Sequence, residues 1–368
     1  MNDLPQKTLG IMALYLNGKK LEEVDYFRKL TIQGKKLEMN VIVFTPEDLH
    51  PTKKAVAALQ YDPLKAKWTR SWKAIPDLIY DRCRYQKNYR FPLLREFRAA
   101  YPQLTYLNRP IAHKWNIHQL LYKDRSIRAF LPETVQYHKP SDLIPFLQKY
   151  TFVYMKPSDG TGGRGILCIR RLANGKYLIQ GRDRSRRIII PRKMRAEQIA
   201  ASFHSWGFKD HYLIQQGIPL ALPDGRVHDY RLLIQKNGQG KWEVTGCAGR
   251  IGPLRSITSN LHGGGKAMPM LKLLQSRFTA SDKITEIQET MEQLSHMVAV
   301  HLEKHYGRLC ELALDIGVSP TGQVWLLEVN PKPAREVFIR IKEFDTYEKA
   351  IRRPLEYALW LHNKNHLE

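Results

Sequence analysis

A glycine-rich segment between two strand-like segments is the feature that most restricts how this chain can fold. Residues 151–156 and 166–170 are both strand-like, and Gly160, Gly162 and Gly165 lie between them in a GxGxxG arrangement. Glycines allow backbone N–H groups to approach a phosphate closely. The dinucleotide-binding form of this pattern requires a helix directly after its last glycine, whereas a strand follows here. The segment therefore predicts a hairpin that can contact phosphate, and a plain surface hairpin is the alternative.

Two other phosphate-binding classes are excluded by the sequence. Protein kinases also place a glycine loop between strands, but the HRD and DFG strings that they require do not occur. The GxxxxGK loop of the nucleoside triphosphatases also fails at Gly265 and Lys266. There Asn260 stands in place of the first glycine, and Ala267 follows the lysine where Ser or Thr is required.

The order of strand-like and helical segments predicts the domain organisation. Residues 8–16 and 41–44 are strand-like with a helix-compatible stretch between them, and strand candidates at 77–80 and 104–107 continue the alternation. This alternation predicts an N-terminal α/β domain over residues 1–110. Further strand candidates follow, with one long amphipathic helix candidate at residues 281–306 among them, and this order predicts an α+β body with a mostly antiparallel sheet.

Two strand candidates near the C-terminus end in oxygen-bearing side chains. Asp315 closes the first, and Glu328 and Asn330 close the second. Side chains alternate along a strand, so Glu328 and Asn330 share a face, and Asp315 can meet them if the two strands form a hairpin. Hard cations such as Mg²⁺ take such ligands and fill their remaining positions with water and phosphates. The alternative is a hairpin whose acids reach solvent or pair with Lys332 or Arg335.

Between the glycine segment and these acids lie further charged and polar residues. Asp229 and Arg231 share one strand face, Arg250 ends a later strand candidate, and Asn260 begins a glycine-rich turn. An arginine fork suits a transferred phosphoryl group. Each of these residues taken singly could equally form a surface ion pair.

The order of these features resembles the ATP-grasp superfamily over residues 111–335. It runs from Lys156 on a strand through the glycine hairpin, a hinge at residues 215–218, the arginines and the Asn260 turn to Glu328-Val329-Asn330-Pro331. With Leu9-Gly10-Ile11-Met12 and Tyr80-Asp81-Arg82 included, the whole chain is similar to the YheC/YheD family of endospore coat-associated ATP-grasp proteins. Asp229-Tyr230-Arg231 resembles a motif of tubulin tyrosine ligase-like enzymes, although Val227 stands where those enzymes carry lysine.

The resemblance implies a Rossmann-like pre-ATP-grasp domain over residues 1–110, followed by an ATP-grasp fold of two α+β subdomains. Residues 111–217 would form the first subdomain with the glycine-rich loop, and residues 218–345 the second with the metal carboxylates. Residues 346–368 would form a C-terminal helix.

The resemblance also implies a site for ATP and Mg²⁺ between the two subdomains. Asp315, Glu328 and Asn330 would bind Mg²⁺, and Arg231, Arg250 and Asn260 would surround the γ-phosphate and an acyl phosphate. Adenine would lie against the hinge, Lys114 and Lys156 would contact the α- and β-phosphates, and the glycine loop would close over them. The implied nucleotide-binding residues are Lys114, Lys156, Ser158, Gly160, Gly162, Gly163, Gly165, Gln215, Gln216, Gly217, Ile218 and Asp229.

The net charge bears on the partner of the protein. The 368 residues include 59 Lys and Arg against 35 Asp and Glu, a formal net charge of +24. Such a charge attracts polyanions and does not choose among nucleic acid, an acidic protein and a phosphorylated ligand. The densest basic stretch, residues 182–195, surrounds three consecutive isoleucines. It is either a strand with solvated basic flanks or an anion-binding surface.

Membrane insertion and secretion are not expected. No window approaches the ~20 consecutive apolar residues that a membrane span requires. The N-terminus lacks a basic segment followed by an apolar one, and the four cysteines stand far apart without a CxxC pair. We therefore expect a cytoplasmic protein, and the resemblance adds association with the spore coat.

The function implied by the resemblance is an ATP- and Mg²⁺-dependent ligase that joins a carboxylate to an amine through an acyl phosphate. The net charge would attract an acidic peptide or protein as the acceptor, and the resemblance adds a spore coat protein as a candidate. A non-catalytic nucleotide-binding or structural coat-associated protein is the first alternative. A nucleic-acid-binding protein, favoured by charge alone, is the second.

Overall fold

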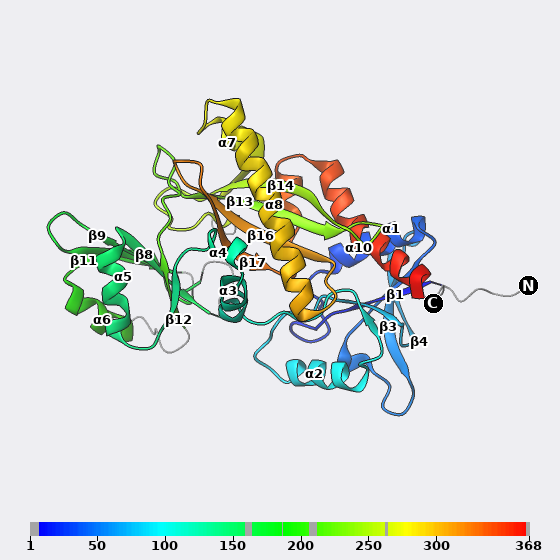
Figure 1. The fold of residues 1–368 in the computed structure, drawn as a ribbon. Coiled ribbons are helices and arrows are strands. Elements are labelled where there is room, and N and C mark those ends of the chain that lie inside the picture. Colours follow the sequence, from blue (N-terminus) through cyan, green and yellow to red (C-terminus); the bar gives the residue numbers. More distant parts are fainter. Residues whose placement is uncertain (1–6, 159–163, 186, 206–211, 262–263, 366–368) are drawn as a thin grey trace, which may run out of the picture.

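The structure of the chain is a computed structural model that describes residues 7–158, 164–185, 187–205, 212–261 and 264–365. Within these ranges the strands form three sheets, which lie side by side along the molecule (Figure 1). In this part of the chain, no helix is both long enough and apolar enough to cross a membrane.

The first sheet forms the N-terminal domain. Its strands are arranged in the order β4-β3-β2-β1-β5-β6, with parallel pairing from β2 to β6 and antiparallel pairing at β3 and β4. Helix α1 covers one face and α2 the other. The bounds are β1 (Thr8–Met12), α1 (Val24–Lys36), β2 (Asn40–Phe44), β3 (Ala55–Asp62), β4 (Lys67–Ala74), β5 (Leu78–Asp81), α2 (Arg90–Ala100) and β6 (Thr105–Tyr106).

The predicted alternation of strands and helices is present in this sheet, but the β3–β4 hairpin was not predicted. Nearly every side chain of β4 is exposed, so the strand has no alternation of apolar and polar residues to reveal it. The first strand ends at Met12, earlier than the predicted 8–16.

The second sheet is antiparallel, in the order β11-β10-β9-β8-β12-β7. Strands β8 and β9 form the hairpin predicted on either side of the glycine-rich segment. Helices α5 and α6 pack on one face of the sheet. The bounds are β7 (Thr134–Tyr137), α5 (Leu143–Lys149), β8 (Phe152–Pro157), β9 (Leu167–Arg171), β10 (Tyr177–Arg182), β11 (Ile188–Met194), α6 (Ala196–Ser205) and β12 (Tyr212–Gln216).

The third sheet is also antiparallel, in the order β15-β14-β13-β16-β17. The long helix α8 packs against it, and so do α3 and α4, which precede the second sheet in the sequence. The bounds are α3 (Lys114–Lys123), α4 (Arg125–Arg128), β13 (His228–Lys236), β14 (Trp242–Ile251), β15 (Lys266–Pro269), α7 (Met270–Gln275), α8 (Ser281–Tyr306), β16 (Glu311–Val318) and β17 (Val324–Asn330).

The chain then returns to the N-terminal domain. After α9 (Glu336–Arg340), helix α10 (Phe344–Asn365) packs against α1. The Lys29 ammonium on α1 donates a hydrogen bond of 2.7 Å to the Tyr347 hydroxyl on α10.

Buried charges also join the first sheet to the third. The carboxylate of Glu311, at the start of β16, is fully buried. It accepts hydrogen bonds from the Tyr80 hydroxyl at 2.5 Å and from Arg82 Nη1 at 2.7 Å, and it pairs with Arg335. Asn108 donates to the Pro331 carbonyl, directly after β17. The N-terminal domain is therefore tied to both strands of the β16–β17 hairpin.

Candidate active site

The β16–β17 hairpin brings two of the predicted metal ligands together. Asp315 and Glu328 are direct partners in the strand register, and Asn330 pairs with Ala313. A tight turn closes the hairpin, in which the Gly322 amide donates to the Ser319 carbonyl at 3.0 Å. Gly322 has a φ of +85°, a conformation that glycine adopts without strain. The turn therefore fixes which residues of the two strands face each other.

Asp315 lies among arginines of the neighbouring strands. Arg231 on β13, its register partner, donates to the carboxylate from Nε at 2.5 Å and from Nη2 at 3.1 Å. Arg250 Nη2 on β14 is 3.0 Å from the same carboxylate. Burial by itself raises the pKa of Asp315, but the two guanidinium charges outweigh it and the pKa is lowered. The carboxylate is therefore charged, which a metal ligand requires.

Arg250 also holds a second carboxylate. Its Nε donates to Asp229 Oδ1 at 2.7 Å, and its Nη2 contacts Asp229 Oδ2. The Ser259 hydroxyl donates to the same Oδ2 at 2.5 Å. Burial lowers the pKa of Arg250, but the two carboxylates raise it more, so the guanidinium stays charged. Asn260, next to Ser259, lines the same pocket as Asp229, Arg250 and Ser259.

Two lysines approach this cluster from the other side. Lys156 on β8 donates from Nζ to Gln215 Oε1 at 2.6 Å, and the Gln215 amide in turn donates to the Thr134 hydroxyl at 3.1 Å. Lys114, the first residue of α3, lies 3.1 Å from Glu328 Oε1. Burial lowers the pKa of Lys156 to about 8, and the Glu328 carboxylate offsets only part of that effect.

The predicted hinge, residues 215–218, begins in the last two residues of β12 and continues beyond the strand. The Gln216 amide donates to the Glu133 carbonyl at 2.8 Å, and the Gly217 amide donates to the Phe152 carbonyl at 3.0 Å. A Cβ at position 217 would lie 2.2 Å from the Phe152 ring, so only glycine fits there. The hinge is thus held close to β8, with Ile218 on the pocket wall.

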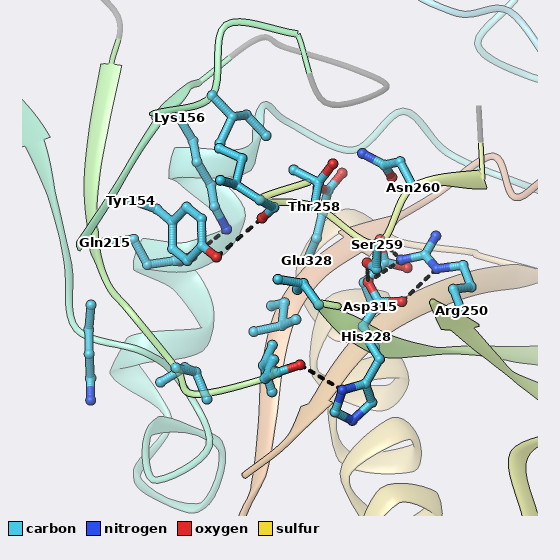
Figure 2. Close-up of a pocket in the computed structure, with 18 residues that line it drawn as sticks. Tyr154, Lys156, Gln215, His228, Arg250, Thr258, Ser259, Asn260, Asp315 and Glu328 are labelled. Carbon is cyan, nitrogen blue, oxygen red and sulfur yellow. Dashed lines mark hydrogen bonds and ion pairs between the residues drawn. The ribbon is translucent and has the colours of Figure 1, made fainter. Parts of the chain in front are cut away.

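These residues line two adjoining cavities. A narrow one of about 100 Å³ has apolar walls from Tyr154, Ile166, Ile218, Ile257 and Leu327. Figure 2 shows its polar ends, with Lys156 and Gln215 on one side and Asp315, Ser259 and Arg250 on the other. The adjoining cavity of about 480 Å³ extends to residues of the N-terminal domain and of α9. The residues that line both are Lys156, Ile166, Arg250, Asn260, Asp315 and Glu328.

The structure gathers most of the predicted site residues around these cavities. Twelve line one or both of them, and these are Lys114, Lys156, Gln215, Gln216, Ile218, Asp229, Arg231, Arg250, Asn260, Asp315, Glu328 and Asn330. Ser158, Gly165 and Gly217 are not among the lining residues, although residues next to each of them are. Gly160, Gly162 and Gly163 lie outside the described residues.

The apolar walls of the cavity and the ion-pair partners of the acids were not predicted from the sequence. Tyr154 precedes Lys156 by two positions on β8, so strand alternation alone could have placed both on one face. The alternative pairing of the acids with Lys332 or Arg335 was wrong. Lys332 contacts Asp81 and the Cys83 carbonyl in the N-terminal domain, and Arg335 pairs with Glu311.

The oxygen-bearing side chains of the hairpin suit Mg²⁺ in type. In the described ranges, no three His, Cys, Asp or Glu side chains gather as metal ligands, so a third protein donor would be the Asn330 amide oxygen. The Asn330 Nδ2 is buried and has no hydrogen-bond partner within the described part of the chain, so protein contacts do not satisfy this amide. Two carboxylates and an amide oxygen are hard donors of the kind that Mg²⁺ prefers. The residues present therefore fit this ion.

Known proteins resemble this chain over most of its length. A family model for YheC/D-like ATP-grasp proteins matches residues 103–361. The endospore coat-associated protein YheC of Bacillus subtilis (strain 168) is 29% identical over 345 residues, which cover 91% of this chain and 90% of YheC.

Two solved structures have a similar fold. The D-cycloserine synthetase DcsG has a TM-score of 0.55 at 12% identity, with 97% of this chain and 99% of DcsG covered. The macrocyclase MdnC, bound with the precursor peptide MdnA from Microcystis aeruginosa MRC, has a TM-score of 0.52 at 14% identity, with 94% and 98% covered. The expectation of an ATP-grasp fold is thereby confirmed.

Proposed function

Because the chain belongs to the YheC/D-like ATP-grasp family, we propose that it is an ATP- and Mg²⁺-dependent ligase that joins a carboxylate to an amine. The observation that carries the proposal is the convergence of cations and carboxylates at one cavity. Lys156, Arg231, Arg250, Asp315 and Glu328 come from strands of two different sheets and line the same space. Residues 111–217 and 218–345 are proposed as the two subdomains that enclose the nucleotide.

The narrow cavity suits the adenine ring of ATP. Its apolar walls match a flat base, and the backbone after Gln216 is fixed next to them by the hydrogen bonds of the hinge. The phosphates would then extend past Gln215 towards Lys156 and Lys114. Asp229 would act on the phosphates indirectly, because it holds the Arg250 guanidinium in position.

Asp315, Glu328 and Asn330 are the residues proposed to hold Mg²⁺, which would neutralise charge on the phosphate oxygens when bound. In the structure the Asp315 carboxylate is paired with Arg231, and the Glu328 carboxylate is paired with Lys114. Those cations would lose their carboxylate partners to the metal and gain phosphate oxygens as new ones. The protein thus keeps its buried charges compensated in both states.

The proposed reaction needs little covalent chemistry from the protein. An acceptor carboxylate attacks the γ-phosphorus, the bond to the β-phosphate oxygen breaks, and an acyl phosphate and ADP result. An amine then attacks the acyl carbon, loses a proton and displaces inorganic phosphate, leaving an amide. Arg231, Arg250 and Asn260 would stabilise the charge on the phosphoryl group during its transfer.

The larger cavity provides room for the acceptor beside the phosphates. The net charge of +24 favours an acidic peptide or protein, and the solved MdnC complex contains a peptide bound to a similar fold. Because YheC is coat-associated, we propose that the acceptor is a spore coat protein or its precursor peptide and that the ligase acts in the cytoplasm or at the coat.

Hydroxylamine trapping tests the proposal without knowledge of the natural amine. The protein is incubated with ATP, Mg²⁺, hydroxylamine and a panel of carboxylates that includes acidic peptides, and hydroxamate and ADP are measured. We expect hydroxamate with at least one acidic peptide, and a loss of about 10²–10³-fold in the Glu328→Gln variant.

Glu286→Gln is the matched control, because Glu286 is exposed and pairs with Lys283 on the same helix, α8. ATP binding without hydroxamate from any acceptor would support a non-catalytic protein instead. Equal rates in Glu328→Gln and the wild type would contradict the assignment of Glu328.

A further inference from the structure

The basic stretch of the sequence forms an exposed strand at the edge of the second sheet. Strand β11 is the outermost strand there, at the end of the molecule away from the N-terminal sheet (Figure 1). Ile188 and Ile190 on β11 are 74% and 75% exposed, whereas Ile189 between them is buried in the core of the sheet. Two large apolar side chains therefore lie next to each other in solvent on one face of an edge strand.

Uncompensated positive charge surrounds these isoleucines. The stretch contains one acidic residue, Asp183, and its carboxylate forms an ion pair with Arg187, whose Nε lies 2.8 Å away. The other basic residues of the stretch that the structure describes form no ion pair with any described residue. They are Arg182, Arg184, Arg192, Lys193 and Arg195. The edge is thus a positive surface with an apolar centre.

The turn between β10 and β11 contacts the glycine segment of the candidate active site. The Gly165 amide donates to the Asp183 carbonyl at 3.0 Å, and the Arg182 amide donates to the Ile166 carbonyl at 2.9 Å. A Cβ at Gly165 would lie 3.4 Å from the Arg184 side chain. These contacts connect the start of β11 at Ile188, through β10, to Ile166, which lines both cavities. A chain lying along the free edge of β11 would be separated from Ile166 by β11 and β10.

We propose, on the basis of the proposed function, that β11 and its basic flanks bind an extended acidic segment of the acceptor peptide. The segment would pack two apolar side chains against Ile188 and Ile190 and place its carboxylates on the surrounding arginines and lysine. The proposed contact is made by side chains, because Pro191 in β11 has no backbone N–H, and proline and lysine on an edge strand hinder the addition of a further strand. A second copy of the same edge is disfavoured, because like charges would face each other.

Nucleic acid explains less of this surface than an acidic peptide does. Residues 182–195 contain no aromatic side chain on which a base could stack, and the two exposed isoleucines would have no role. A peptide with alternating acidic and apolar residues matches both the charge and the apolar centre.

Fluorescence anisotropy with labelled synthetic peptides tests the proposal. The probe is a peptide of about twelve residues that alternates Glu and Val, and the comparison probes are a Glu-Ser repeat and an oligo-dT of similar length. We expect Arg192→Glu with Lys193→Glu to weaken Glu-Val binding by about tenfold or more at ~50 mM salt. We expect Ile188→Ser with Ile190→Ser to weaken it by about threefold or more.

Controls with matched changes lie far from this edge. Lys35→Glu with Lys36→Glu on α1 reverses the same number of exposed charges, and Leu64→Ser removes an apolar side chain that is 96% exposed. Both controls should bind the Glu-Val peptide within about twofold of the wild type, as expected for substitutions outside a binding surface.

Three results would overturn the proposal. These are unchanged peptide binding in either β11 variant, equal affinity for the Glu-Ser and Glu-Val peptides, and tighter binding of oligo-dT that depends on the same residues. The Glu328→Gln variant separates this proposal from the proposed ligase activity, because it should lose turnover and still bind the peptide. If the wild type binds the peptide in this pattern but forms no hydroxamate, the docking surface stands and the ligase does not.

Discussion

Replacing Glu311 by glutamine should destabilise the fold severely, although residue 311 lines neither of the two cavities. The Glu311 carboxylate has no exposed surface, and Arg82 and Arg335 both pair with it. The Tyr80 hydroxyl and the Gln235 amide donate to it as well, at 2.5 Å and 3.0 Å. Glutamine keeps the shape of the side chain and removes its charge, so the substitution isolates the electrostatic contribution.

The expected size of the effect follows from what remains around the arginines. Arg82 keeps a second carboxylate, Glu23, whose oxygen lies 2.8 Å from Nη2. Among its direct contacts, Arg335 keeps the carbonyls of Pro333 and Ala350, the hydroxyl of Tyr80 and the ring of Tyr26, and none of these groups carries a charge. The Glu23 carboxylate then faces the charges of both Arg82 and Arg335, and Arg335 has lost its direct partner. Breaking such a buried pair costs about 3–5 kcal/mol.

Equilibrium urea unfolding of the purified variant measures this change. We expect the unfolding free energy to fall by about 3–5 kcal/mol, and Glu286→Gln, which removes an exposed partner of Lys283, to change it by less than about 0.5 kcal/mol. A loss below about 1 kcal/mol in Glu311→Gln would refute the reasoning. It would show that, in the variant, other groups stabilise the Arg335 charge in place of the Glu311 carboxylate.

Three further predictions concern the nucleotide site. ATP affinity should fall above pH 8 by about tenfold per pH unit, because the Lys156 ammonium with its pKa of about 8 loses the proton that binds phosphate. Calorimetry on Lys156→Arg, which stays charged, should show no such step. Gly217→Ala should cost about 1–3 kcal/mol in urea unfolding and weaken ATP binding, because its Cβ would lie 2.2 Å from the Phe152 ring. Gly238→Ala, with a nearest atom at 3.5 Å, is the control and should leave both measurements unchanged. ATP affinity should be about tenfold or more higher with Mg²⁺ than without it, because the ion would release Arg231 from Asp315 and allow it to bind phosphate. Equal affinities would contradict the proposed exchange of partners.

Local patterns predicted the elements that have a regular apolar period. The helix predicted over residues 281–306 is α8, because its apolar side chains repeat at helical spacing and pack on the third sheet. The hairpin that carries Asp315 and Glu328 was predicted because alternation and a turn sequence are both local properties. Strand β4 was missed because its residues face solvent and have no such period.

The counter-charges of the site could not be predicted in the same way. Arg231 meets Asp315 only because β13 lies between β14 and β16 in the sheet, and strand order is a property of the whole domain. The basic residues closest to these acids in the sequence are therefore not their ion-pair partners. Lys332 and Arg335 follow β17 closely, but the chain turns there towards the N-terminal domain and both side chains find acids outside the candidate site.

Strand β16 carries two buried carboxylates that differ in their access to the cavity. Glu311 and its partner Arg82 have no exposed side-chain surface, so no ligand can reach them and their pairing is structural. Asp315 lies four residues further along and lines the cavity, and its partner Arg231 is 16% exposed. The neighbouring pair of Lys114 and Glu328 is 32% exposed on each side. Exchange of a protein partner for a phosphate or a metal requires contact with the cavity, so it is available at Asp315 and Glu328 and closed at Glu311. The same strand thus holds the N-terminal domain in place with one carboxylate and presents the other to the cavity that we propose for the nucleotide. Substitution at Glu311 should therefore reduce stability, and substitution at Asp315 should reduce ligand binding.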